Sequence, residues 1–320
     1  MFARLVSESF VRNPRRKILT AAAIGAGVAA LQFAFAPALS AKERELKVLS
    51  EKTVTGFGHV ESVGYDPKEK VFYTSDFGAA LKPADKDGQG KITKVSLDGK
   101  ILADGFLKPD GNVMNKPKGI WIKGKHLWVT DIDGVWEFDL KTKEGKKLLL
   151  PGIEFANDPV IIGKVLYVSD NRSDQLFSVE PADFMKSKTP PKITVVFKGK
   201  GVFPNGLYAG SKGTLLMVGF ESKDKPHGIY EMTLPNGEPK LISDNIGMLD
   251  GLYRMKNGDL LATDWVSGTL FQWNKKMGKH DLASGFKGPA DICVVPNDKG
   301  LLVAVPDLVK GEIRLVQLGK

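Results

Sequence analysis

The chain has 320 residues, which allows one large domain or two ordinary ones, and its 42% hydrophobic and 26% charged residues are typical of a soluble globular protein. Its formal net charge is +9, but the sequence has no block of basic residues with interleaved aromatics of the kind that binds nucleic acid. We therefore favour a solvated, lysine-rich surface over a polyanion site and expect no nucleic-acid partner. The single cysteine, Cys293, excludes an internal disulfide and is interpreted as a buried structural thiol.

Residues 1–41 have the order of a secretory signal, with basic residues, then an apolar stretch over 18–36, then small residues. The run Arg-Arg-Lys-Ile-Leu at 15–19 resembles the twin-arginine signal that directs folded bacterial proteins to the periplasm, although Pro14 stands where Ser or Thr is usual. We therefore expect a signal peptide over 1–41, a periplasmic protein, and no membrane contact beyond the leader. An uncleaved anchor is the alternative, because the apolar stretch is almost long enough to span a bilayer.

After the leader, one unit of about 45 residues recurs six times. Each unit has a polar residue that opens an apolar strand, a turn, a second apolar strand that usually ends in Asp, and then a third and a weaker fourth strand. The second strands lie at 71–76, 127–131, 166–170, 215–218, 260–264 and 301–304. The polar residues that open the six units are Glu61, Lys118, Asn157, Asn205, Asp250 and Asp291.

The third strands alternate apolar and polar residues, as in Val-Trp-Glu-Phe-Asp at 135–139, and no long segment after the leader has helical periodicity. Six units of about four strands predict an all-β fold: a six-bladed β-propeller with four-stranded antiparallel blades, in which neighbouring sheets bury each other. No linker interrupts the array, so residues 45–320 are expected to form one domain. A β-sandwich or an open solenoid is the alternative.

In a propeller the innermost strand of each blade starts near the central axis, so residues at equivalent starts converge. Four of the six starts, Glu61, Asn157, Asn205 and Asp250, carry oxygen donors, with no imidazole or thiolate among them. Calcium prefers six to eight oxygens, whereas zinc usually recruits His or Cys. Taken singly, Asn-Gly and Asp-Gly are ordinary turn signals; their equivalent positions in the repeat favour one calcium-type divalent cation on the axis, with Mn²⁺, Zn²⁺ or Mg²⁺ as alternatives.

This ordered set resembles the regucalcin/gluconolactonase (SMP-30/gluconolactonase/LRE-like) family and its relatives diisopropylfluorophosphatase and paraoxonase, over about residues 57–307. The resemblance implies a six-bladed propeller with Glu61, Asn157, Asn205 and Asp250 as metal ligands. It also implies that Asp158 orients the Asn157 amide or a water at the metal, although a plain loop aspartate is equally compatible.

The sequence departs from familiar members of the family elsewhere. The opening of the second unit, with Asn115 and Lys118, differs from the sugar-binding sequence of regucalcin-like lactonases, so that pocket does not carry over. The histidine dyad of paraoxonase is not evident either; His59 and His126 are the nearest candidates, and a strand-flank or turn role is favoured for both.

The predicted function is metal-dependent hydrolysis of a small-molecule lactone or related ester, with Asp250 as general base or nucleophile. Lys118, Asn115 and Asp291 are candidate substrate-binding residues, and the loops 77–90 and 221–228 are candidate lids. No Gly-x-Ser-x-Gly elbow, phosphate loop or haem motif is present, while a quinone-binding or strictosidine-synthase-like propeller is compatible with the fold. The alternative from another class is a non-catalytic, exported binding or scaffold propeller; the oligomeric state is left open.

Overall fold

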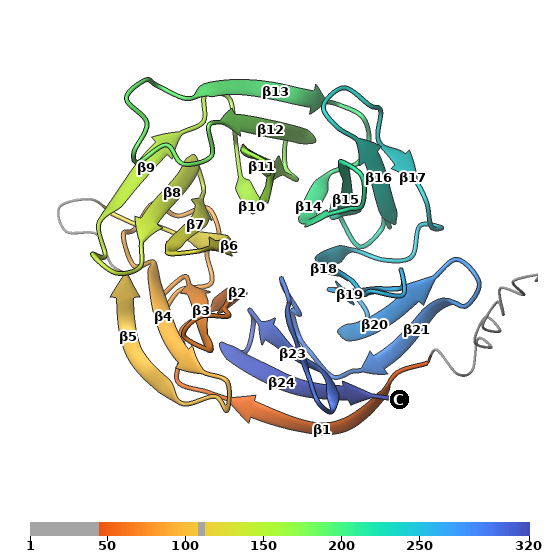
Figure 1. The fold of residues 1–320 in the computed structure, drawn as a ribbon. Helices are drawn as coiled ribbons and strands as arrows, with labels where there is room; N and C mark the ends of the chain where they lie inside the picture. The colour runs from red at the N-terminus through yellow and green to blue at the C-terminus, as the bar shows by residue number, and fades with distance from the viewer. Residues whose placement is uncertain (1–44, 108–112) are drawn as a thin grey trace, which may run out of the picture. The chain divides into compact units, whose positions relative to one another are not determined.

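A computed structural model describes residues 45–107 and 113–320, in which six four-stranded antiparallel sheets are arranged around a central axis (Figure 1). This confirms the predicted all-β, six-bladed propeller with four-stranded blades. The predicted signal peptide, residues 1–41, lies outside the described residues. Within the described ranges, no helix is long and apolar enough to cross a bilayer.

The blades follow one another in chain order. Within each of the first five blades, the first strand lies nearest the axis and the fourth lies at the outside (Figure 1). The first three blades consist of β2 (Val60–Asp66), β3 (Val71–Asp76), β4 (Lys91–Ser96) and β5 (Ile101–Leu107); β6 (Pro117–Lys123), β7 (His126–Asp131), β8 (Gly134–Asp139) and β9 (Gly145–Leu149); and β10 (Ala156–Ile162), β11 (Val165–Asp170), β12 (Gln175–Glu180) and β13 (Lys192–Lys198).

The fourth and fifth blades consist of β14 (Pro204–Ala209), β15 (Thr214–Gly219), β16 (Ile229–Thr233) and β17 (Lys240–Leu241); and β18 (Leu249–Arg254), β19 (Leu260–Asp264), β20 (Thr269–Asn274) and β21 (Gly278–Ala283).

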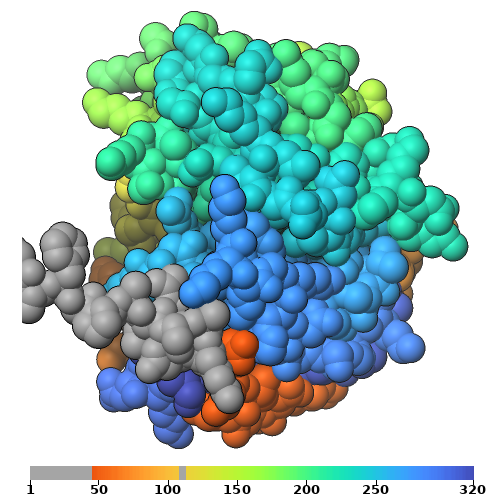
Figure 2. Space-filling model, turned by 90° about the vertical axis from the view of Figure 1, so that its right-hand side faces the viewer, coloured from red at the N-terminus to blue at the C-terminus, as the bar shows by residue number. Residues whose placement is uncertain are grey.

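The sixth blade takes strands from both ends of the domain. It consists of β22 (Cys293–Asn297), β23 (Gly300–Asp307), β24 (Glu312–Gly319) and, as its outermost strand, β1 (Lys47–Val54). β1 pairs antiparallel with β24 from Lys47 opposite Gly319 to Val54 opposite Ile313. In Figure 2 the orange surface of β1 lies beside the blue and indigo surfaces of the last two blades. This pairing closes the ring and covers an edge of β24 that would otherwise be exposed.

Six of the seven hydrophobic clusters in the described residues lie one between each pair of neighbouring blades, and a smaller seventh consists of Phe77, Ala290 and Leu308. Between blades two and three, for example, Trp128 and Val135 pack against Val168, Phe177 and other residues of blade three. The second strands of the first three blades, β3, β7 and β11, are buried along almost their whole length between neighbouring blades, which explains their largely apolar sequences. Each fully buried Leu, Val or Phe contributes roughly 1.5–3 kcal/mol through the hydrophobic effect, so the ring is stabilised by its blade-to-blade contacts.

Candidate functional site

A cavity of about 470 Å³ lies at the end of the axis where the inner strands of the first five blades begin. Glu61, Asn157, Asn205 and Asp250 all line it, and each is the second residue of its inner strand, in β2, β10, β14 and β18 respectively. The structure therefore brings together the four predicted ligand residues from four blades. Lys118, the second residue of β6, lines the same cavity.

The inner strands carry a register irregularity at their starts, which turns these side chains toward the axis. Such a bulge leaves a residue out of regular pairing and re-aims its side chain. The pairing of each of the five inner strands with the second strand of its blade shifts there: between Val60 and Ser62, Pro117 and Ile120, Ala156 and Pro159, Pro204 and Leu207, and Leu249 and Leu252.

The aspartates that end the second strands hold these starts in place. Asp76 accepts hydrogen bonds from the backbone N–H groups of Gly58 and His59, at 2.8 and 3.0 Å, just before β2. Asp131 and Asp264 do the same for the residues before β6 and β18. The recurrent Asp of the sequence repeat is thus a structural acceptor that fixes the start of the inner strand in the blades that carry it.

The fourth blade has Gly219 at the equivalent position, and a neighbouring blade supplies the missing carboxylate. Asp174, in the β11–β12 turn, accepts from the N–H groups of Gly201, Val202 and Phe203 at 2.6, 3.0 and 2.7 Å. These bonds fix the approach to β14 and therefore the position of Asn205.

Glycines that follow the cavity residues let the inner strands approach each other closely. A Cβ at Gly206 would lie 2.0 Å from the backbone oxygen of Asp250, and one at Gly251 would lie 2.6 Å from the backbone nitrogen of Ile292. No side chain can be placed at such distances. The glycine of Asn-Gly and Asp-Gly is therefore required by the packing of strands around the axis as well as by local turn geometry.

The donor set fits a divalent cation. Glu61 Oε2, Asn205 Oδ1 and Asp250 Oδ1 are buried and have no hydrogen-bond partner within the described residues. The amide nitrogen of Asn157 donates to Asn171 Oδ1 at 3.3 Å, and the Asn205 side chain is hydrogen-bonded to Asp250, so each amide has a carbonyl oxygen left for a ligand. Buried oxygens without partners are costly, and several converging from separate strands are typical of a hard-cation site.

The electrostatics of the cavity also favour a cation. Burial raises the pKa of Glu61 and of Asp250 well above the usual carboxyl values, and neighbouring acids add to the effect, Asp250 on Glu61 and Asp291 on both. Burial lowers the pKa of Lys118 to about 8, while Glu61 opposes that shift. A divalent positive charge among these groups would favour the ionised carboxylates.

Two cations and an aromatic wall form one side of the cavity. The Lys118 Nζ lies 4.1 Å from the centroid of the Phe155 ring, and the Arg172 guanidinium lies 4.0 Å from the same ring. Neither Arg172 nor Phe155 was predicted as a site residue, because Arg172 is in the β11–β12 turn and Phe155 just precedes β10. Strand periodicity does not report on such positions; the topology of second-to-third-strand turns is the signal that could have found Arg172.

The two loops predicted as lids contribute residues to the mouth. Phe77 and Pro83 come from the first loop, and Glu221 from the second. The first loop is fixed by Lys116, a fully buried lysine whose Nζ donates to Phe77 O at 2.9 Å and to Asp87 Oδ2 at 2.7 Å. It is therefore an anchored wall in this structure.

Several predicted site residues lie elsewhere. Asn115 does not line the cavity; its Oδ1 accepts the N–H of Gly88 at 3.1 Å and so supports the first loop. Asp158 and Asp291 line a separate cavity of about 310 Å³ bounded by the inner strands. Asp158 Oδ2 accepts the Leu207 N–H at 2.6 Å, which ties β10 to β14.

Asp291 accepts a hydrogen bond from Ser62 Oγ at 2.6 Å, and burial raises its pKa to about 7. His59 Nδ1 lies 2.8 Å from Leu308 O, outside the cavity lining. His126 opens β7, at the other end of blade two from Lys118. The two histidines therefore form no dyad in the cavity.

Neither a scan of protein-family models nor a search of curated proteins found a match to this chain. Among solved structures, the fold is similar to a candidate gluconolactonase, with a TM-score of 0.62, 15% identity, and coverage of 85% of this chain and 94% of that one. A gluconolactonase from Xanthomonas campestris matches with a TM-score of 0.61 and 11% identity, over 85% and 91% of the two chains. A streptogramin B lyase matches with a TM-score of 0.54 and 14% identity, over 84% and 98%. At these identities the likeness shows a shared propeller fold, and two of the three neighbours are described as gluconolactonases.

Proposed function

We propose that the protein is a divalent-cation-dependent hydrolase of a lactone or related ester. One observation carries the proposal: oxygen side chains from four blades converge on one cavity and leave three buried oxygens without hydrogen-bond partners within the described residues. The fold similarity to two gluconolactonase structures supports the choice of reaction, although fold by itself does not determine function.

Glu61, Asn157, Asn205 and Asp250 would hold the cation. The all-oxygen set favours Ca²⁺, with Mn²⁺, Mg²⁺ and Zn²⁺ as the alternatives. The bound ion would supply Lewis-acid polarisation of the substrate carbonyl.

We assign proton transfer to Asp250, which, like Glu61, is a carboxylate that lines the cavity with an unpaired oxygen. Acting as a base, it accepts a proton from water as the water oxygen bonds to the carbonyl carbon. The acyl C–O bond then breaks, and the departing alkoxide takes up the proton. In the alternative route, the Asp250 carboxylate attacks the carbonyl carbon, the acyl C–O bond breaks to release the alcohol, and water then hydrolyses the resulting anhydride to the same acid and the free carboxylate.

Lys118 and Arg172 would favour a substrate that carries an anionic group. Both cations lie against Phe155, and together they place positive charge on the wall of the cavity. Arg172 offers a planar, multidentate donor to a carboxylate, and Lys118 a single point charge. A lactone or ester with a carboxylate or similar substituent therefore fits better than a neutral one.

The test is hydrolysis of a lactone and aryl-ester panel by the purified protein, with Ca²⁺ added or chelated. We expect turnover that depends on the metal and falls at least 100-fold in Asp250→Asn. The matched control is Asp298→Asn, an exposed aspartate in the β22–β23 turn. Undetectable turnover by the metal-loaded protein, with tight ligand binding intact, would instead support a non-catalytic binding propeller.

We also propose that residues 1–41 direct export to the periplasm. The support is the basic, apolar and small-residue order of this segment and its twin-arginine-like run. Cell fractionation and the intact mass of the recovered protein test this. Recovery of the uncleaved chain from the cytoplasm alone would contradict it.

A further inference from the structure

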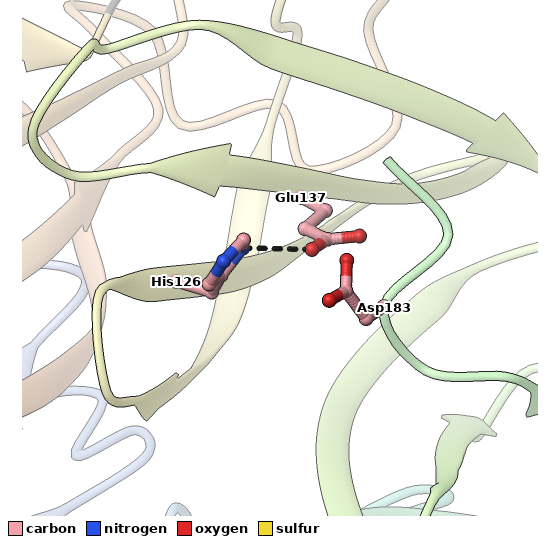
Figure 3. Close-up of side chains that lie close together, drawn as sticks. All are labelled: His126, Glu137 and Asp183. Carbon is pink, nitrogen blue, oxygen red and sulfur yellow. Dashed lines mark ion pairs between the residues drawn. The ribbon is translucent and has the colours of Figure 1, made fainter. Parts of the chain in front are cut away.

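A second group of titratable side chains lies between blades two and three, away from the axial cavity. It consists of His126 in β7, Glu137 in β8 and Asp183 in the connection from β12 to β13, and Figure 3 shows the three side chains directed toward one another. The proposed function uses none of them. Their candidate ligand atoms all lie within 4.8 Å of one another.

The pair at the centre of this group is buried and poorly satisfied. Glu137 is fully buried, and its Oε1 lies 2.8 Å from His126 Nδ1. The two atoms nevertheless lack hydrogen-bond geometry, and neither has another hydrogen-bond partner in the described part of the chain. A buried carboxylate oxygen and an imidazole nitrogen that face each other without a hydrogen bond form a site with unused ligand capacity.

The state of the side chains suits a metal. Burial lowers the pKa of His126, which favours the neutral imidazole that binds metals. Burial raises the pKa of Glu137 to about 7, and the adjacent Asp183 acts in the same direction. A cation would relieve the repulsion between these two carboxyl groups.

The backbone around Asp183 is held against blade two on both sides. Trp128 Nε1 donates to Ala182 O at 2.9 Å, and the Met185 N–H donates to Glu137 Oε2 at 2.8 Å. Asp183 therefore presents its side chain from a fixed segment, as a preorganised ligand does. Zinc ligands at about 2.0–2.2 Å from the ion are roughly 3–3.5 Å apart, so the site needs an adjustment of about 1 Å, which the half-exposed Asp183 side chain can provide.

An entry path is present. His126 and Asp183 line a cavity of about 370 Å³ together with Trp128, Ala182 and other residues. Three protein ligands with one side open to a cavity resemble the arrangement of zinc sites that keep a position for water.

One neighbouring cation opposes metal binding. Lys186 Nζ lies 2.9 Å from His126 Nε2, and Lys186 is 55% exposed. A hydrogen bond from the ammonium to Nε2 places the imidazole proton on Nδ1, the atom that faces Glu137. A metal at Nδ1 must displace that proton and tolerate the nearby charge, so Lys186 should weaken the site.

We propose that His126, Glu137 and Asp183 form a second metal site, for a Zn²⁺-type transition metal bound through one nitrogen and two carboxylates. The site differs in ligand chemistry from the all-oxygen axial set. Its occupation would clamp the β12–β13 connection of blade three onto β7 and β8 of blade two.

The test is Zn²⁺ binding by the full chain, measured by competition with a chromophoric chelator in the presence of saturating Ca²⁺. We expect one equivalent to bind to the wild type and to Asp250→Asn, and at least 10-fold weaker binding to Asp183→Asn and Glu137→Gln. The matched control, Asp298→Asn, should bind like the wild type. Lys186→Met should bind several-fold more tightly.

A Co²⁺-loaded sample gives an independent readout, because its visible spectrum should show nitrogen ligation that is lost in His126→Asn. Asp183 is half exposed, so Asp183→Asn and Lys186→Met decide the question even if the buried variants do not fold. The proposal is overturned if wild-type binding is weaker than about 100 μM, if Asp250→Asn abolishes it, or if Asp183→Asn and Lys186→Met leave the affinity unchanged.

Discussion

Asp250→Asn should change the stability of the protein in opposite directions with and without calcium. Without the ion, burial and neighbouring acids disfavour the Asp250 carboxylate, so a neutral amide of the same shape should stabilise the fold at pH 7. With calcium, the same substitution removes one of only two carboxylates in the predicted ligand set and should weaken the bound state. Asp250→Asn should therefore have the higher melting temperature without calcium, and the wild type should have the higher one when calcium is added.

The size of the effect follows from binding linkage. Calcium at 100 times its dissociation constant stabilises the native state by about 2.7 kcal/mol. One kcal/mol shifts the melting temperature of a domain this large by about 2 °C, so the wild type should gain about 5 °C. The variant should gain less than about 2 °C at the same calcium concentration.

The assay is thermal unfolding followed by circular dichroism, in chelator and in a calcium series. Asp298→Asn is the control, and it should melt like the wild type in both conditions. If Asp250→Asn and the wild type gain equally from calcium, Asp250 is not a ligand. If the variant is less stable than the wild type in chelator as well, the inference that burial and neighbouring acids disfavour the ionised Asp250 carboxylate is wrong.

The other predictions concern the second cavity, the substrate and the closure of the ring. The pKa of Asp291 is raised from 3.8 to about 7 in the folded chain; because the native state then holds its proton more tightly than the unfolded state, metal-free stability should fall as pH rises from about 4 to about 7. In urea melts across that range Asp291→Asn should flatten this fall, and an unchanged slope would contradict the assignment. Lys118→Met should raise KM about 10–100-fold for an anionic ester while leaving a neutral ester nearly unaffected; equal effects on both would remove Lys118 from substrate recognition. A chain that starts at residue 55, without β1, should melt at least 10 °C lower, as scanned by calorimetry, because β24 loses its partner; a shift of under 2 °C would show that the closure contributes little.

The fold could be predicted because two sequence signals, the alternation within strands and the polar residue that opens each unit, recur with the same spacing. Alternation marked the strands, and the polar residue at the start of each unit marked the end nearest the axis. The equivalence of Glu61, Asn157, Asn205 and Asp250 was visible because each is the second residue of its inner strand. Their convergence then follows from the geometry of the ring.

The remaining features could not be predicted from the repeat because they depend on contacts between blades. Asn115 and Lys118 are only three residues apart, yet Asn115 supports a loop of blade one whereas Lys118 lines the cavity. Asp291 opens its unit as the other five residues do, but it lies before β22 and lines the second cavity. A shift of one or two residues in strand phase changes the side to which a side chain points.

Arg172 and Phe155 illustrate a second limit. Both lie in segments between strands, where no periodic pattern indicates the direction of the side chain. The contacts of Lys118 and Arg172 with the Phe155 ring depend on how blades two and three meet. Likewise, the cluster of His126, Glu137 and Asp183 joins two blades, and nothing in the repeat pattern brings these three residues together.

The pairing of β1 with β24 also sets a condition on biosynthesis. All four predicted axial ligands are translated by residue 250, but the blade that lies between the fifth and the first needs strands from both ends of the domain. Until β24 has left the ribosome and can pair with β1, Glu61 in blade one and Asp250 in blade five are not held at their final separation. The axial cavity should therefore form in one step with ring closure, once β24 is available, and a chain terminated before β24 should lack the cation site even though it contains every ligand.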